Sequence, residues 1–119
     1  MVVKKKEFTQ ERILVDTGAV TVAGAISTNS IRGVYRLKAT NLYAGKNKLY
    51  IDGLKGATAT SKDMLRFNVA DEVQDWPGYD VTEDSLPFWL FKATDYDHIQ
   101  LTAENATVEV LITHSDVDH

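Results

Sequence analysis

The sequence contains no cysteine, only two prolines among its 119 residues, and no long run of apolar residues. The absence of cysteine excludes disulfide bonds, thiolate nucleophiles and most structural zinc sites. Because a membrane-spanning helix needs about 18 consecutive apolar residues, no such helix is predicted. The first residues, MVVKKKEFTQ, place lysines before a polar stretch, so a secretory signal is not expected there. These absences favour a reducing compartment, or an assembly that is stable without cross-links.

What the sequence does contain is the alternation typical of β-strands. Between Ala106 and Thr113 small and apolar residues occupy every second position, which is the period of a strand with one buried face. Residues 98–104 alternate in the same way, and the short connection at Glu104-Asn105 predicts a hairpin between these two strands. Further strands are expected at 8–15, 20–26, 35–39, 49–51, 65–69 and 86–93, and no helical stretch of convincing length is present.

About eight strands in a chain of this length, with 44% hydrophobic residues, predict a single domain spanning residues 1–119. The expected fold class is all-β, an antiparallel β-sandwich of about eight strands that is jelly-roll-like, with a small closed β-barrel as the alternative. Four segments should lie outside the strands: a basic N-terminal arm of about residues 1–7, long loops at 52–63 and 70–85, and an acidic C-terminal tail at 114–119.

The charges are sorted along the chain. Residues 1–66 contain 12 of the 13 Lys and Arg with five acids, whereas residues 67–119 contain one base, Lys92, with 12 acids. The first part therefore carries +7 and the second −11, which the overall −4 conceals. Such an asymmetry indicates a partner, unless strands from the two parts interleave and pair their charges within the sheet.

Two aromatic groups are candidates for contact surfaces. In Trp76-Pro77-Gly78-Tyr79 a tight turn would present two rings as a rigid platform, or Trp76 would fold back and cover an open end of the sandwich. In the segment 87–91 (PFWLF) both faces of the expected strand are apolar. Such a strand is either covered on both sides or packed against another subunit.

No catalytic constellation is recognisable. His114, Ser115 and Asp116 are consecutive, so in a strand they point to alternating faces and cannot form a proton relay. The glycines Gly53 and Gly56 are not followed by the Lys-Ser/Thr pair of a phosphate-binding loop. We therefore expect no enzyme, no catalytic residues and no cofactor.

Two groups of residues have ligand types that suit a divalent cation, but the pattern is weak. Acids at a chain end usually form a solvated tail, and an Asp-x-Asp pair at a turn usually accepts hydrogen bonds from backbone amides. We therefore expect no metal site. The two groups are His114, Asp116 and Asp118, and Asp95, Asp97 and His98.

These features predict a non-enzymatic structural or assembly protein that acts through protein–protein contacts. A basic arm and an acidic loop, both peripheral, suit a repeated head-to-tail contact between copies, hence a homo-oligomer. By analogy from the fold, the expected role is a virion component of a virus or phage, a capsid decoration (cement) or minor capsid protein. Its partners would be copies of itself and a larger capsid or assembly protein, within a virion assembled in the host cytoplasm. The interface residues are expected to be Lys4, Lys5, Lys6, Asp71, Glu72, Asp75, Trp76, Tyr79, Asp80, Phe88, Trp89 and Phe91.

Two alternatives belong to other functional classes. In a carbohydrate-binding module, Trp76 and Tyr79 would stack on sugar rings while Asp75 and Asp80 bind hydroxyls. In a single-stranded nucleic-acid binder, the basic residues 1–66 and their interleaved aromatics would contact the strand. The acidic second part would repel phosphates, so nucleic acid is not the expected partner, and neither is a membrane.

Overall fold

The computed structural model describes residues 7–56 and 58–118, in which it contains β-strands and no helix. Accordingly, the described residues include no helix long and apolar enough to cross a membrane. The strands are β1 (Thr9–Val15), β2 (Val20–Val22), β3 (Ser30–Asn41), β4 (Asn47–Lys55), β5 (Thr58–Phe67), β6 (Val73–Trp76), β7 (Trp89–Lys92), β8 (His98–Ala103) and β9 (Val108–Asp118).

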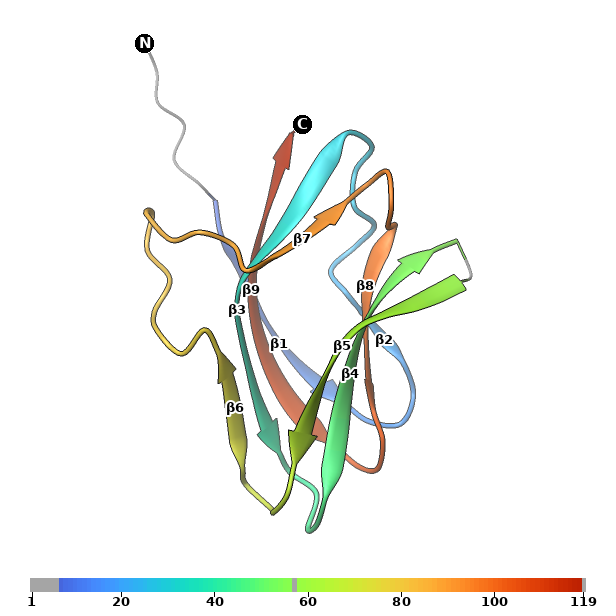
Figure 1. Cartoon of the computed structure of the whole chain (residues 1–119), viewed down its shortest axis with the longest axis vertical. Coiled ribbons are helices and arrows are strands. Elements are labelled where there is room, and N and C mark those ends of the chain that lie inside the picture. Colours follow the sequence, from blue (N-terminus) through green and yellow to red (C-terminus); the bar gives the residue numbers. More distant parts are fainter. Residues whose placement is uncertain (1–6, 57, 119) are drawn as a thin grey trace.

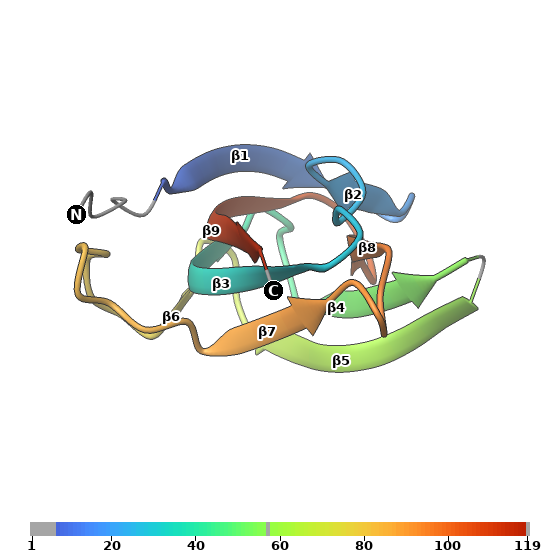
Figure 2. The same cartoon turned by 90° about the horizontal axis from the view of Figure 1, so that it is seen from above.

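The strands form two antiparallel sheets that face each other (Figures 1 and 2). The first sheet has the order β1-β9-β3-β6, with β7 also paired to β3, and the second has the order β2-β8-β4-β5. Within the described residues no ladder closes the two sheets into one ring. The predicted antiparallel β-sandwich is therefore confirmed, and the closed barrel that was its alternative is wrong.

The core lies between the sheets and comes from the alternation that the sequence shows. On β3 and β9, Leu37 pairs with Ile112 and Ala39 with Val110, and all four side chains are fully buried. Leu49 on β4 reaches the same core from the opposite sheet. Each large apolar side chain that is buried in this way contributes about 1.5–3 kcal/mol, so this alternation is the main source of stability.

The predicted hairpin of residues 98–104 and 106–113 is wrong, because β8 lies in the second sheet and β9 in the first. The connection is held from elsewhere in the chain. The backbone N–H of Asn105 donates to Oδ1 of Asn47 at 2.9 Å, and that of Glu104 donates to the carbonyl of Lys48, also at 2.9 Å. These bonds hold the turn at residues 104–105 beside the start of β4. After this turn the chain crosses from the second sheet to the first, where it forms β9.

The loop expected at 52–63 is instead the hairpin of β4 and β5. Its ladder continues to the pair Lys55 and Thr58, with a register shift after Ile51. Gly56 has a φ of +61°, a conformation that the turn requires and glycine adopts at little cost. Gly53 lies directly under the ring of Tyr96, so its small size reflects close packing and not loop flexibility.

The other segments expected outside the strands also differ in part. The acidic tail at 114–119 is ordered within β9 as far as Asp118, because Asp116 binds Arg32 on the neighbouring β3. The loop at 70–85 contains β6, which pairs with residues 37–40 of β3. Residues 77–88 then leave the sheet and return as β7 along the same side of β3. Most of the basic arm, including Lys4, Lys5 and Lys6, lies outside the described residues.

Candidate functional site

The sorted charges meet across the sandwich. Six ion pairs between Lys or Arg and a carboxylate lie within the described residues, and each joins a base from residues 1–66 to an acid from residues 67–119. A basic surface for phosphates would need these cations free of carboxylates. Five of the 12 bases and six of the 12 acids therefore neutralise each other within the folded chain. The pairs are Arg12–Glu109, Arg32–Asp116, Arg36–Asp75, Arg36–Asp80, Lys48–Glu104 and Lys55–Asp97.

Arg36 on β3 binds both of the carboxylates that were expected to serve an interface or a sugar. Its Nε and Nη2 donate to Oδ1 and Oδ2 of Asp75 at 3.1 and 2.8 Å, and its Nη1 donates to Oδ1 of Asp80 at 2.6 Å. These hydrogen bonds lower the pKa of Asp75 below its ordinary value and raise that of Arg36. Arg36, which the sequence did not single out, thus ties β3 to β6 and to the segment that follows it.

Trp76 packs into an aromatic cluster at the side of the sandwich. Its ring meets those of Trp89 and Phe88 edge to face, at centroid distances of 5.4 and 6.3 Å, and all three are partly buried against the core. Phe91 is fully buried and belongs to the core itself, so it contributes nothing to the surface of the folded chain. Trp76 therefore folds back against the sandwich and does not form a free platform, but it packs at the side and not at the open end that was expected.

Tyr79 follows the cluster but does not join it. Its side chain is 59% exposed, after a turn in which Gly78 has a φ of +95°. Within the described part of the chain, no ring contact links Tyr79 to Trp76. The two rings therefore do not act as the single stacking platform that the sequence suggested.

A first group of exposed apolar residues lies at the end of the sandwich where β3 ends, the lower end in Figure 1. The fully buried Asn41 organises it. Its Nδ2 donates to the carbonyls of Gly45 and Val69 at 2.9 and 2.8 Å, and its Oδ1 accepts the backbone N–H of Tyr43 at 3.1 Å. We call this surface the Asn41 patch: Leu42, Tyr43, Val69 and Val73.

The same network places two of the expected interface residues. The backbone N–H of Asp71 donates to the carbonyl of Asn41 at 2.8 Å, and the carbonyl of Glu72 accepts from the N–H of Asn41 at 2.9 Å. Both acids therefore lie in the loop that carries Val69 of the Asn41 patch. The sequence predicted this loop to be a contact surface because of its acids and aromatics, but it did not indicate the patch.

A second apolar group lies on the outer face of the first sheet, toward the end where β3 begins. Leu90 on β7 pairs with Gly33, and Val117 on β9 pairs with Ile31, which lies between them on β3. Leu86, which is 78% exposed, lies in the segment that immediately precedes β7. We call this surface the β7 patch: Leu86, Leu90 and Val117.

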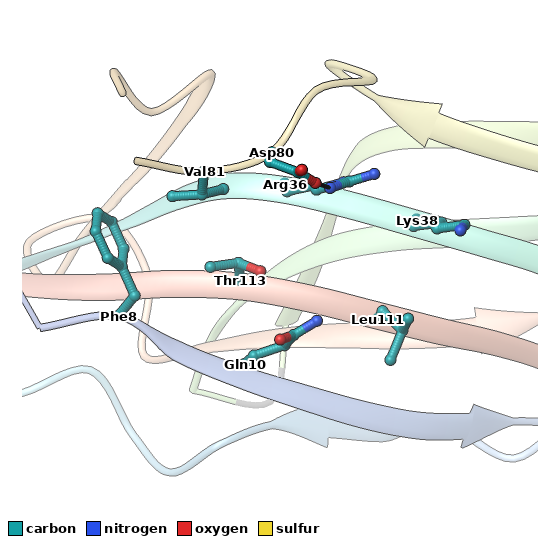
Figure 3. Close-up of a pocket in the computed structure, with 8 residues that line it drawn as sticks. All are labelled: Phe8, Gln10, Arg36, Lys38, Asp80, Val81, Leu111 and Thr113. Atoms are coloured by element: carbon teal, nitrogen blue, oxygen red, sulfur yellow. Dashed lines mark hydrogen bonds and ion pairs between the residues drawn. The ribbon is translucent and has the colours of Figure 1, made fainter. Parts of the chain in front are cut away.

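The outer face of the first sheet also carries a groove of about 590 Å³ (Figure 3). Its floor is formed by Leu111 and Thr113 of β9, and Arg36 and Lys38 of β3 lie along one side. Gln10 of β1 lies on the opposite side. Phe8 and Val81 stand at one end, and Asp80 joins Arg36 above the floor.

His114 and Asp116, two residues of the consecutive trio, differ in their contacts: Asp116 is held by an ion pair, whereas Nε2 of His114 is buried without a hydrogen bond among the described residues. His114 is buried, with Nε2 at 4.0 Å from Oε1 of Glu11, and burial followed by the charge of Arg32 lowers its pKa. Asp116 binds Arg32 with both carboxylate oxygens. Among the described residues, no three His, Cys, Asp or Glu side chains gather as a metal site would require.

In the second group of potential ligands, Asp95, Asp97 and His98, the side chain of Asp97 binds the backbone. Oδ2 of Asp97 accepts the N–H of Gly56 at 2.7 Å, and this bond lowers the pKa of Asp97 below its ordinary value. Nζ of Lys55 lies 3.4 Å from its other oxygen. Asp97 therefore fastens the tip of the β4–β5 hairpin, as an acid at a turn commonly does.

The chain has little similarity to known proteins. No family model and no curated protein matches the chain. Among solved structures, it is similar to a chain in the structure described as "Bacillus endospore appendages form a novel family of disulfide-linked pili". That similarity has a TM-score of 0.47 and 8% sequence identity, and it covers 99% of this chain and 94% of the other.

Proposed function

We propose that the protein is a non-enzymatic structural subunit that assembles with copies of itself through two different ends. The observation that carries this proposal is the pair of exposed apolar surfaces, the Asn41 patch and the β7 patch, near opposite ends of β3. Ten residues separate Ile31 from Asn41, which in a strand is roughly 33 Å. One chain therefore cannot bring its two patches together.

Contact between two unlike patches has a defined consequence for assembly. A heterologous contact repeats from copy to copy and produces a ring or an open chain of subunits. The buried hydrogen bonds of Asn41 hold the Asn41 patch in one arrangement before any partner binds, so little conformational entropy is lost on association. Clustered exposed apolar side chains are themselves typical of protein contact sites.

More specifically, we propose that the protein is a virion component: a capsid decoration or minor capsid protein that also binds a larger capsid protein. Its support is the strand order, in which β1, β3 and β9 lie in one sheet while β2, β4, β5 and β8 lie in the other. With β6 and β7 counted as one interrupted strand beside β3, this order is compatible with an eight-strand jelly roll, a fold that occurs in viral capsid domains. This step is analogy from the fold.

The proposal is tested by the mass of the full chain in solution. Light scattering should show species larger than the monomer whose mass rises with concentration. Val69→Asp in the Asn41 patch and Leu90→Asp in the β7 patch should each give monomers. Both side chains are exposed, so neither change should unfold the protein.

Mixing the two variants distinguishes a heterologous contact from a symmetric one. Each variant keeps one intact patch, so the mixture should form dimers that cannot grow further. Leu14→Asp, at an exposed position on the outer strand β1, is the matched control and should assemble like the parent chain. A parent chain that stays monomeric, or a loss of assembly in Leu14→Asp alone, contradicts contact through the two ends.

A further inference from the structure

The groove on the outer face of the first sheet is separate from both patches and from the aromatic cluster. Its floor and sides come from the middle of β1, β9 and β3, while the segment after β6 supplies Asp80 and Val81 (Figure 3). Its volume of about 590 Å³ is within the range of small-ligand sites, roughly 300–1,000 Å³. The groove lies on the same face as the β7 patch, but none of its lining residues belongs to either patch.

The charges of the groove and its surroundings disfavour an anion as the ligand, because Asp80 in the groove and Asp75 beside it both offset its two cations. Arg36 is neutralised by Asp75 and Asp80, at 2.8 and 2.6 Å. Lys38 acts on the same Asp75 through its charge and helps to lower the pKa of that carboxyl. Two cations are thus balanced by two carboxylates, and a phosphate or carboxylate ligand would meet no net positive charge.

The groove also contains polar side chains that take no part in these ion pairs, and together they offer both hydrogen-bond donors and acceptors. Within the described part of the chain, the amide of Gln10, the ammonium of Lys38 and the hydroxyl of Thr113 have no hydrogen-bond partner. They line the floor and both sides of the groove. Lys38 only donates, Gln10 donates and accepts through separate atoms, and a threonine hydroxyl does both. A ligand that carries many hydroxyls satisfies such a mixture, because each hydroxyl also donates and accepts.

Apolar surface complements these groups. The ring of Phe8 is fixed edge to face against Tyr35, with centroids 4.9 Å apart, and stands at one end of the groove near Val81. Leu111 provides an apolar part of the floor. A sugar ring has the matching character, since it presents C–H groups on its faces and hydroxyls around its edge.

We propose that this groove binds a neutral glycan. Gln10, Lys38 and Thr113 bind hydroxyls, and Phe8 and Leu111, at opposite ends of the groove, contact the apolar faces of different sugar rings of the glycan. The site differs from the one that the sequence suggested, because Trp76 is packed into the aromatic cluster and does not line the groove. The proposal does not depend on self-association.

The test is a titration of the isotope-labelled full chain with three neutral probes, maltopentaose, cellopentaose and N-acetylchitopentaose, followed by amide chemical shifts. At least one probe should shift the amides of residues 8–10, 36–38 and 111–113 in a saturable way. Lys38→Met should weaken that binding about tenfold or more, since a hydrogen bond from a charged group is lost. Lys46→Met removes an exposed lysine outside the groove and is the matched control.

Each other result overturns the proposal. Absence of saturable shifts with all three probes removes the ligand class. Shifts centred on Tyr79, with binding lost in Tyr79→Ala and kept in Lys38→Met, show that the sugar binds at the exposed turn and not in the groove. Equal weakening by Lys38→Met and Lys46→Met shows a general effect of charge and no binding in the groove. Assembly measured on the same variants reports separately on the proposed function.

Discussion

Asp116→Ala should be among the most destabilising single changes on the surface of this protein. Asp116 lies near the end of β9 and holds Arg32 with two hydrogen bonds, at 2.8 and 2.9 Å. Arg32 is only 3% exposed, and its Nη1 also donates to the carbonyls of Val22 and Gly24 at 3.2 and 2.8 Å. Removal of Asp116 therefore leaves a buried guanidinium without its counter-charge.

The size of the effect follows from these contacts. Loss of one partner of a buried ion pair costs about 3–5 kcal/mol. Here the cost should be lower, because the side chain of Asp116 is itself 36% exposed and Arg32 keeps its two carbonyl acceptors. We expect a loss of about 2–3 kcal/mol in the free energy of unfolding, which is a large part of the 5–15 kcal/mol typical of a domain.

Urea denaturation at neutral pH measures this loss. With a slope of about 1–3 kcal/mol per molar urea, the midpoint should fall by roughly 0.7–3 M while the slope stays unchanged. Arg32→Met should also destabilise, and the double variant should lose less than the sum of the single losses, since neither charge is then left alone. The control is Arg12→Met, which breaks a more exposed pair with Glu109 and should cost at most about 1 kcal/mol. A loss in Asp116→Ala no larger than in Arg12→Met refutes the reasoning.

Three further predictions concern other parts of the fold. The pKa of His114 is lowered mainly by burial, so the folded state favours the neutral ring and the unfolded state takes up the proton first. Stability should therefore fall as the pH decreases through about 6.5 toward the lower folded pKa, and His114→Gln should reduce this dependence in urea titrations at each pH. Gly53→Ala should destabilise the folded protein by about 1–3 kcal/mol, because the new methyl group collides with the ring of Tyr96. Adding Tyr96→Ala, which removes that ring, should relieve much of the strain. Asn47→Ala should cost about 2–3 kcal/mol in thermal or urea unfolding, since it removes a buried hydrogen bond to Oδ1 of Asn41 and part-buried bonds to one carbonyl and two backbone N–H groups.

The existence of most strands could be predicted from the sequence, because alternation reports directly that one face is buried. Residues 108–113 are an example, and β9 contains them. The partner of each strand could not be predicted in the same way. The hairpin expected at Glu104-Asn105 fails because the side chain of Asn47, 58 residues away, accepts the N–H of Asn105. Strand β6 was missed because its four residues, VQDW in an acid-rich segment, do not alternate between apolar and polar.

The burial of Arg32 and its pairing with Asp116 were beyond prediction for a different reason. Arg32 occupies the same face of β3 as Val34, and Asp116 the same face of β9 as Ile112, so their strand positions point inward. A charged residue in a strand usually indicates an exposed position. Arg32 is buried because it binds Asp116, 84 residues away, and the local sequence does not reveal this partner. The groove likewise requires β1, β3, β9 and the segment after β6 together, whereas the sequence offered only adjacent candidates such as Trp76 and Tyr79.

The sorted charges lead to a last prediction, about how the two parts of the chain meet. Of the strand pairs in the two sheets, only β4–β5 lies within residues 1–67, and every other pair joins that part to residues 68–119 or lies in the latter. Each of the six described Lys or Arg ion pairs also joins the two parts. Neither part can therefore complete a sheet or neutralise its charge alone.

A cut between Phe67 and Asn68 separates fragments of formal charge +7 and −11 without dividing a strand. We expect each fragment alone to show no cooperative unfolding, and a mixture to recover the β-sheet signal in circular dichroism. Because the opposite charges steer the encounter, the association rate should fall about tenfold or more between about 0.01 M and 1 M salt. Folding of either fragment alone contradicts the dependence on interleaved strands. An association rate that ignores salt shows instead that the sorted charges act only after the strands have met.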